Sequence, residues 1–334
     1  MVNQHPEPET AVFLAELAVG DPSAFDELTI DERRAGLEAM FLAAAPVAPK
    51  IQQGTITIPA RDGRQITGLT FYPGGAEHSS SAEHPRSAEP SGGTAVLPVL
   101  FLIQGGGWAL SGAAPYAPLA ALLATELQRL VVVVDFRLAP EHKFPCGLED
   151  CVDAYGWLQE NAGLVGGDSD NIAVFGDSAG GNLAGALSLS CEEQGLKKPT
   201  ALVLVYPMID VQPGSANVYP SRQEYGGGGY LLTEASIMSS AADYVRSLDL
   251  LAHPMVSLVQ QADLTHFPRT IIITAGMDPL RDEGKVFADR LRNAGVDVTY
   301  KVYDGTIHGF LSLFHRLSVA YEAVSFLQKA LSKA

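Results

Sequence analysis

Positive charge, cysteine and long apolar runs are all scarce in this sequence of 334 residues. Only 22 Lys and Arg residues stand against 38 Asp and Glu residues, which gives a net charge of −16. Because nucleic acids and anionic membrane surfaces attract positive charge, this balance argues against both as partners. No segment reaches the roughly 18 consecutive apolar residues that a membrane-spanning helix requires, so we expect no integral membrane association.

The three cysteines, Cys146, Cys151 and Cys191, are an odd number and lack the spacing of a metal site. They therefore indicate reduced thiols rather than a disulfide framework or a metal centre. The first residues, MVNQHPEPET, have neither the basic nor the apolar region of a secretory signal. We expect a cytoplasmic protein.

Short apolar runs dominate the chain from residue 97 onward, and helical stretches separate most of them. After a hairpin over 54–73, we expect strands at 98–103, 130–136, 171–176, 200–207, 269–276 and 297–304. Their continuous apolar character indicates strands that are covered on both faces. Strands that alternate with helices predict an α/β fold with a parallel sheet and right-handed crossovers. Ligands of such sheets bind at the carboxyl ends of the strands, so the polar residues after each run are the candidates for function.

The remaining segments divide the chain around this predicted core. Residues 1–50 are expected to form N-terminal helices, and the core would comprise 51–210 and 253–334. A segment rich in Ser, Gly, Pro and Glu, about 74–93, is expected to be a mobile surface loop. Residues 211–252 are far more than a crossover needs. We expect this insertion to fold over the functional edge of the sheet and to form a helical cap with the N-terminal helices.

The sequence IAVFGDSAGGN, residues 172–182, places Gly-x-Ser-x-Gly between a predicted strand and a predicted helix. This context is that of a nucleophile elbow, where small residues around the serine let the chain turn sharply and expose its Oγ. Ser178 is therefore the candidate nucleophile. The N–H of Ala179, at the start of the helix, would face a developing oxyanion.

A nucleophilic serine needs a general base and a carboxylate that orients the base. Among the eight histidines, His308 directly follows the last predicted strand, at the same edge of the sheet as Ser178. Asp278 follows the preceding predicted strand, which places it one strand away from His308. Asp210, at the entrance to the insertion, also follows a strand and remains the alternative. The chain order Ser, Asp, His agrees with either carboxylate.

Three consecutive glycines, Gly105 to Gly107, follow the predicted strand 98–103. Residues without a Cβ let backbone amides approach a ligand closely. Because this loop lies at the same sheet edge as Ser178, we expect the N–H groups of Gly106 and Gly107 to join that of Ala179 as oxyanion donors.

The motifs GGGW, DFRLAPEHKFP, GDSAGGN, YPMID, DPLRDEG and HGF occur in this order over about residues 54–330. In this order and spacing they resemble the hormone-sensitive-lipase-like branch of the α/β-hydrolases, the family IV esterases. The resemblance implies an eight-stranded, mostly parallel sheet with a first antiparallel strand and a helical cap. It also implies a serine carboxylesterase that acts on short- to medium-chain or other small-molecule esters, without metal or cofactor. Similar proteins often form homodimers through the last strand and helix.

The positions that match the family motifs assign a role to each candidate residue. The resemblance implies that Ser178, Asp278 and His308 are the catalytic triad. It further implies that the oxyanion donors are Gly106, Gly107 and Ala179.

Gln104 departs from the family pattern, which has histidine before the three glycines. In the family this histidine braces the glycine loop through hydrogen bonds, and a glutamine amide offers donors and an acceptor for the same task. We therefore interpret Gln104 as loop support. Two alternatives to a carboxylesterase remain. One is serine chemistry at the same site on a lactone, an amide or a cyclisation substrate, and the other is a non-hydrolytic small-molecule receptor.

Overall fold

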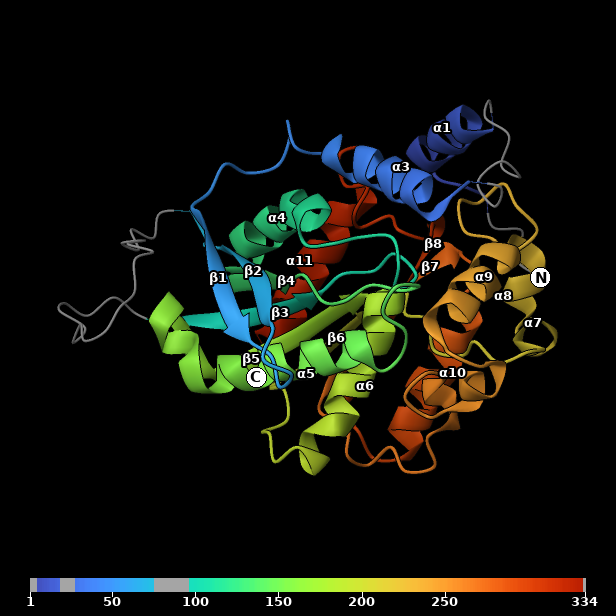
Figure 1. Ribbon diagram of the computed structural model, residues 1–334. Helices are drawn as coiled ribbons and strands as arrows, with labels where there is room; N and C mark the ends of the chain where they lie inside the picture. Colours follow the sequence, from blue (N-terminus) through green and yellow to red (C-terminus); the bar gives the residue numbers. More distant parts are fainter. Residues whose placement is uncertain (1–4, 19–27, 75–95, 333–334) are drawn as a thin grey trace.

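The computed structural model describes residues 5–18, 28–74 and 96–332. The surface loop expected at about 74–93 lies outside the described residues, except for Gly74. The described chain forms a central sheet with helices on both faces, and a further group of helices lies beside β7 and β8 (Figure 1).

Eight strands form one sheet in the order β1-β2-β4-β3-β5-β6-β7-β8. Strands β3 to β8 run parallel, whereas β2 is antiparallel to both of its neighbours, β1 and β4. The predicted mostly parallel, eight-stranded sheet is therefore confirmed. The expectation that the first strand is the antiparallel one is wrong, because it is the second strand of the hairpin that pairs with β4. The strands are β1 Gln53–Pro59, β2 Gln65–Phe71, β3 Leu97–Ile103, β4 Leu130–Val134, β5 Gly167–Asp177, β6 Leu202–Val205, β7 Thr270–Met277 and β8 Val298–Ile307.

Helices pack on both faces of the sheet. On one face α4 and α11 contact each other, and on the other α5 contacts α6 while α10 packs against β7 and β8. The α-helices are α1 Pro8–Leu17, α3 Ile30–Leu42, α4 Ala117–Leu127, α5 Cys146–Asn161, α6 Ala179–Glu193, α7 Ser215–Val218, α8 Pro220–Tyr225, α9 Glu234–Tyr244, α10 Arg281–Asn293 and α11 Val319–Leu331. Short 3-10 helices are η1 Ala114–Tyr116, η2 Ala162–Val165, η3 Leu248–Ala252 and η4 Leu258–Gln260.

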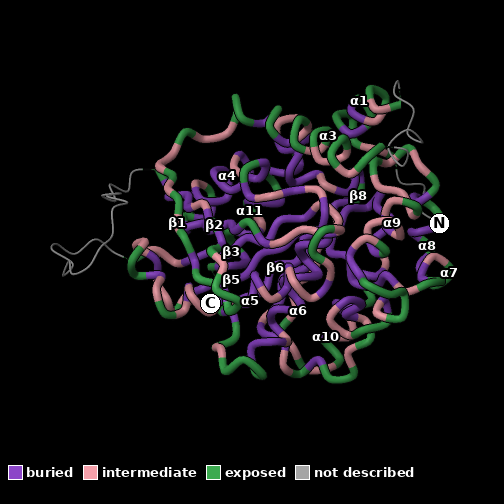
Figure 2. The backbone as a smooth tube through the Cα atoms, in the orientation of Figure 1, coloured by how far each residue is buried: buried purple, intermediate pink, exposed green. Residues whose placement is uncertain are grey.

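Successive residues of the central strands point to opposite layers of the core. In β4, Val132 belongs to the layer with α5, α6 and α10, whereas Val131 and Val133 belong to the layer with α4 and α11. Every residue of β4 is buried, and the central strands lie within an almost continuous buried zone (Figure 2). The prediction that these strands are covered on both faces is confirmed.

Helix α3 connects the N-terminal region to the functional edge of the sheet. Arg33 Nη2 lies 3.7 Å from Asp243 Oδ2 on α9. Arg34 donates hydrogen bonds to the carbonyl oxygens of Ala109 and Ala139, at 2.8 and 3.1 Å. These contacts join α3 both to the segment between β6 and β7 and to the loops that follow β3 and β4. The division of the chain into core and cap stays a prediction.

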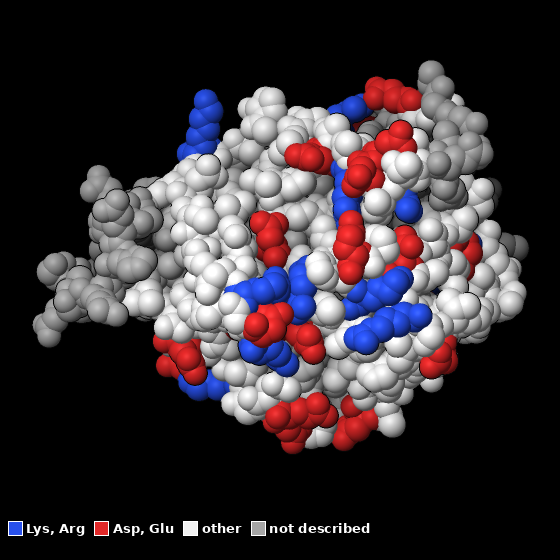
Figure 3. Space-filling view, in the orientation of Figure 1, with Lys and Arg blue, Asp and Glu red and all other residues white. Residues whose placement is uncertain are grey.

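The surface mixes charges of both signs. On the face drawn in Figure 3, basic and acidic side chains lie next to one another across the middle of the molecule. One paired cluster is anchored at a buried group: Arg64 and Arg137 bind the carboxylate of Asp150 at 2.6 and 2.8 Å. The bond from Arg64 ties the β1–β2 hairpin to α5, and the bond from Arg137 ties the loop after β4 to the same helix. None of the described helices has both the length and the apolar character that a bilayer crossing requires.

Candidate active site

The chain turns sharply at Ser178, between the end of β5 and the start of α6. Ser178 has φ 54° and ψ −123°, a conformation that residues with a side chain rarely adopt. A Cβ at Gly176 would lie 2.2 Å from the carbonyl oxygen of Gly180, and one at Gly180 would lie 2.1 Å from that of Ile103. Because atoms cannot approach so closely, the turn requires glycine at both positions. The close contact between Gly180 and Ile103 places the start of α6 directly against the end of β3.

Ser178, His308 and Asp278 lie in one hydrogen-bonded series. His308 Nε2 is 2.9 Å from Ser178 Oγ, and His308 Nδ1 is 2.8 Å from Asp278 Oδ2. The other oxygen of Asp278 accepts the N–H of Leu280 at 2.8 Å, which fixes the orientation of the carboxylate. Asp278 is fully buried, whereas Ser178 and His308 are 7 % and 8 % exposed to solvent. In this arrangement a histidine can take the proton of the serine while a carboxylate holds its other nitrogen.

The alternative carboxylate, Asp210, has a different set of partners. Its Oδ2 accepts the hydroxyl of Tyr219 at 3.0 Å. Its Oδ1 accepts the backbone N–H and the side-chain amide of Gln212, both at 3.1 Å. Asp278 rather than Asp210 therefore contacts His308.

The three expected oxyanion donors lie on two adjoining segments. Gly106 and Gly107 have φ of 100° and 59°, in the left-handed region that favours glycine. Ala179 is the first residue of α6, directly after Ser178. The close approach of Gly180 to the end of β3 brings these two segments together. Their role as oxyanion donors stays a prediction.

Gln104 is completely buried at the end of β3. Its Nε2 donates to the carbonyl oxygen of Val134, at the end of β4, over 3.0 Å. Within the described part of the chain, its Oε1 has no hydrogen-bond partner. The side chain thus connects two strand ends and fixes the point at which the glycine loop begins. That Gln104 supports the glycine loop in this way stays a prediction.

Helix α9 packs directly on the glycine loop. A Cβ at Gly107 would lie 2.5 Å from Ser240 Oγ, so a larger residue there would require this side chain on α9 to move. The next residue, Trp108, stacks on Tyr244 with ring centroids 4.4 Å apart and planes at 2°. The segment between β6 and β7 is therefore part of the surroundings of the site.

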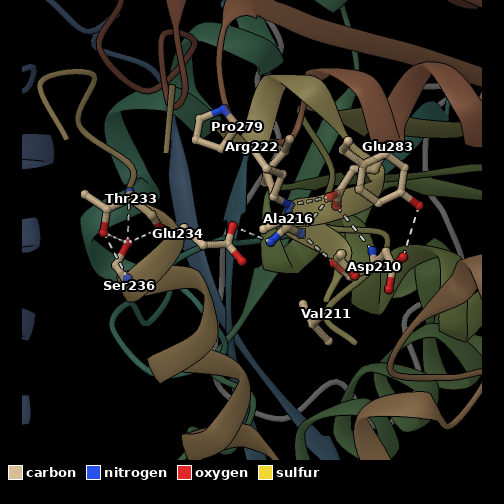
Figure 4. A network of polar contacts seen from close by, with 12 residues as sticks. Asp210, Val211, Ala216, Arg222, Thr233, Glu234, Ser236, Pro279 and Glu283 are labelled. Carbon is tan, nitrogen blue, oxygen red and sulfur yellow. Dashed lines mark hydrogen bonds and ion pairs between the residues drawn. The ribbon is translucent and has the colours of Figure 1, made fainter. Parts of the chain in front are cut away.

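A buried ion pair joins this segment to the helix that follows Asp278. Arg222 on α8 donates from Nε and Nη2 to Glu283 on α10, at 3.0 and 2.6 Å, and from Nη1 to Glu234 at 3.0 Å (Figure 4). Burial raises the pKa of Glu283 to about 7, and the guanidinium of Arg222 opposes this rise. From the sequence, Glu283 is an ordinary acid in the first turn of a helix. The structure shows that its carboxylate anchors the start of α10, next to the loop of Asp278.

No metal centre is formed by the residues that the structure describes, since no group of three or more His, Cys, Asp or Glu side chains is placed to hold an ion. Cys146, Cys151 and Cys191 are free thiols. Burial raises the pKa of Cys151 and raises that of Cys191 to about 11, which keeps both thiols protonated at neutral pH.

The comparisons with known proteins agree with this geometry. The family of the α/β hydrolase fold matches residues 100–312, a range that contains Ser178, Asp278 and His308. The carboxylesterase NlhH of Mycobacterium tuberculosis is 37 % identical over 243 residues, which cover 71 % of this chain and 74 % of that protein.

Two solved structures extend the similarity to nearly the whole chain. An esterase of Pyrobaculum calidifontis is 33 % identical, with a TM-score of 0.83 and 98 % of each chain covered. An ester hydrolase from the metagenome of Lake Arreo, solved with a bipyridine phosphonate derivative, is 30 % identical, with a TM-score of 0.85 and 98 % of each chain covered. The chain belongs to the α/β hydrolase-fold family, in its hormone-sensitive-lipase-like branch of ester hydrolases.

Proposed function

We propose that this protein hydrolyses carboxylic esters through an acyl-enzyme on Ser178, with His308 as general base and acid and Asp278 as the orienting carboxylate. The observation that carries the proposal is the hydrogen-bonded series that these side chains form. The relatives support the same chemistry, because those compared are a carboxylesterase, an esterase and an ester hydrolase.

The reaction proceeds in two acyl transfers. His308 Nε2 removes the proton of Ser178 Oγ as this oxygen attacks the ester carbonyl, and the resulting oxyanion accepts hydrogen bonds from Gly106, Gly107 and Ala179. His308 then gives the proton to the departing alcohol. Water, activated by the same nitrogen, attacks the acyl-enzyme and releases the acid. Throughout, Asp278 holds Nδ1 protonated and stabilises the imidazolium.

The proposed substrates are short- to medium-chain or other small-molecule esters, selected by a cap. In this proposal, the N-terminal helices of 1–50 and the insertion 211–252 form the cap. The bond between Arg33 and Asp243 supports it by joining α3 to α9, as does the packing of α9 on the glycine loop.

A series of p-nitrophenyl esters from acetate to decanoate tests the function. We expect hydrolysis that is fastest for short to medium acyl chains and that requires Ser178. A protein that binds these esters without releasing p-nitrophenol would be a receptor, and this result would contradict the proposal. Turnover of lactones or amides in preference to all esters of the series would favour the related serine chemistry at the same site.

Gln104 provides a prediction about the glycine loop. If its bond to Val134 fixes the start of the loop, Gln104→Ala should lower kcat by about tenfold to a hundredfold, because a single oxyanion donor contributes about 10²–10³. KM should change less, since the donors act mainly on the transition state. Gln104→His should retain the activity or increase it. Steady-state kinetics on p-nitrophenyl butyrate tests this prediction. Full activity of Gln104→Ala would show that the loop keeps its conformation without the side chain of Gln104.

Leu231 supports a prediction about substrate choice. It has φ 72°, and the N–H of Leu232 donates to the carbonyl oxygen of Tyr230 at 2.9 Å, which makes a strained three-residue turn. Its side chain is 37 % exposed. Leu231 Cδ2 lies 3.7 Å from where a Cβ of Gly309 would be, beside His308. Strained turns that hold a side chain next to a catalytic residue are often part of a ligand site.

We therefore expect Leu231→Ala and Leu231→Trp to shift the acyl-length profile in opposite directions. The ratio of kcat/KM for hexanoate and acetate should change by about tenfold, since one methylene in a pocket is worth about 10- to 200-fold. Leu248 is the matched control, because it lies in the same insertion and is 64 % exposed. An unchanged ratio in both Leu231 variants would mean that the turn lies outside the acyl site.

Two further features of the proposal concern the protein in solution. A cytoplasmic location is supported by the three free thiols.

A homodimer is supported by the position of β8 at one edge of the sheet. The N-terminal segment occupies part of this edge, since the N–H of Glu7 donates to the carbonyl oxygen of Gly305 at 2.9 Å. A second copy would have to pair with the remaining part of β8, which sedimentation equilibrium of the full chain tests.

A further inference from the structure

Asp177, the residue before the nucleophile, holds the first glycine of the oxyanion loop. The N–H of Gly105 donates to Asp177 Oδ1 at 2.9 Å and to the hydroxyl of Tyr116 at 3.0 Å. The hydroxyl of Tyr116 in turn donates to Asp177 Oδ2 at 2.9 Å. Asp177 and Tyr116 are 3 % and 1 % exposed. The three groups thus form a closed, buried triangle between the nucleophile elbow, the glycine loop and η1.

We infer that Asp177 and Tyr116 are positioning residues, which orient Gly105 so that the next two amides, of Gly106 and Gly107, converge on the oxyanion. The inference rests on the proposed function, because it assigns a task in stabilising the transition state of ester hydrolysis. Neither side chain needs to touch the substrate for this task.

The loop needs such an anchor because of its composition. Glycine loses more conformational freedom on ordering than any other residue, and three stand in sequence here. The far end of the loop is fixed by its own turn, in which the carbonyl oxygen of Gly106 accepts the N–H groups of Ala109 and Leu110 at 3.0 and 2.8 Å. At the near end, the side chain of Gln104 donates to the carbonyl oxygen of Val134, at the end of β4. The bond of Gly105 to Asp177 ties the loop to the nucleophile elbow, and its bond to Tyr116 ties the loop to η1.

The fit around Gly105 is close on the side where a Cβ would stand. A Cβ there would lie 2.8 Å from the carbonyl oxygen of Asp177 and 3.0 Å from the hydroxyl of Tyr116. The position of Tyr116 is in turn fixed by packing, because its ring lies edge to face with that of Phe41 on α3, with centroids 5.3 Å apart. A displacement of the triangle would therefore move the loop, and the loop cannot shift without breaking these bonds.

The charge of the carboxylate adds strength to the anchor. Burial raises the pKa of Asp177 to about 6, while the bonds from Tyr116 and Gly105 and the proximity of His308 oppose this rise. The group is thus mainly ionised at neutral pH, and hydrogen bonds to an ionised acceptor are stronger than neutral ones. Its removal would also leave the hydroxyl of Tyr116 without its acceptor in a buried place.

Three variants test the inference on p-nitrophenyl butyrate. We expect Asp177→Ala to lower kcat by about tenfold to a hundredfold, within the effect of one lost oxyanion donor, with KM changed by less than about threefold. Asp177→Asn keeps an acceptor oxygen for Gly105 and should retain most of kcat. Tyr116→Phe removes one of the two acceptors and should lower kcat by about threefold to tenfold.

The matched control is Tyr155→Phe, which removes another buried tyrosine hydroxyl, bonded to the carbonyl oxygen of Lys197 at 3.0 Å. Its kcat should equal that of the parent protein. The inference is overturned if Asp177→Ala keeps its kcat, or if Asp177→Asn falls as far as Asp177→Ala. If Asp177→Ala does not fold, Tyr116→Phe decides, and a kcat equal to that of Tyr155→Phe overturns the inference. A parent protein without esterase activity would instead contradict the proposed function.

Discussion

Replacing Ser178 by alanine is expected to reduce ester hydrolysis to the background rate while leaving the fold intact. In the proposed mechanism the hydroxyl is the attacking group, and loss of a serine nucleophile costs about 10⁶ in kcat in serine hydrolases with such a triad. The fold should tolerate the change because alanine has the same Cβ in the same turn, and because Ser178 Oγ bonds only to His308 among the residues that the structure describes. The release of p-nitrophenol, followed at high enzyme concentration, measures the loss. The melting temperature should change by less than about 4 °C, which corresponds to about 1 kcal/mol.

Ser188 is the matched control for this experiment. It lies on α6, is 2 % exposed against 7 % for Ser178, and its hydroxyl donates to the carbonyl oxygen of Ala184 at 3.1 Å. Ser188→Ala should therefore keep the parent kcat. Retention of more than about one per cent of the activity by Ser178→Ala would mean that another group is the nucleophile.

The second large effect is expected for Asp278→Asn, which should lower kcat by about 10³- to 10⁴-fold. Asp278 Oδ2 lies 2.8 Å from His308 Nδ1, so the carboxylate keeps this nitrogen protonated and leaves Nε2 free to accept the proton of Ser178. An asparagine amide can donate to Nδ1 instead, which selects the opposite tautomer. The geometry would be retained and the proton transfer lost, so kcat should fall much more than KM rises.

Asp210→Asn distinguishes the two candidate carboxylates. Its partners are Tyr219 and Gln212, so we expect an effect on the surrounding segment and a kcat within about tenfold of the parent. If Asp210→Asn were the more damaging substitution, the acid of the triad would be misassigned.

The sequence predicts the sheet because its strands are apolar on both faces and end in polar or glycine residues. Ser178, Asp278 and His308 could be proposed as candidates because each follows a strand whose carboxyl end lies at one edge of a parallel sheet. The direction of the hairpin was harder to predict. Two antiparallel strands can join a sheet through either one, and only the packing decides that β2 rather than β1 pairs with β4.

Contacts between distant residues could not be predicted from one sequence. The bond between Arg222 and Glu283 spans 61 positions, and that between Gly105 and Asp177 spans 72. From local pattern, Glu283 is only an acid in the first turn of a helix, and Asp177 is only a variable position of Gly-x-Ser-x-Gly. Their roles depend on which strand ends adjoin in the folded chain. The family resemblance allowed Gln104 to be interpreted as loop support, but for the same reason the sequence did not indicate that its partner is the carbonyl oxygen of Val134 on β4.

The central claim is that Ser178 is the nucleophile, and covalent labelling tests it most directly. A p-nitrophenyl phosphonate should inactivate the protein with release of one p-nitrophenolate per chain, because attack by Ser178 Oγ on phosphorus displaces that group. Mass spectrometry of the digested protein should find the phosphonyl group on the peptide that contains Ser178. The Ser178→Ala variant should remain unlabelled. A label on any other serine, or equal labelling of the variant, would contradict the account.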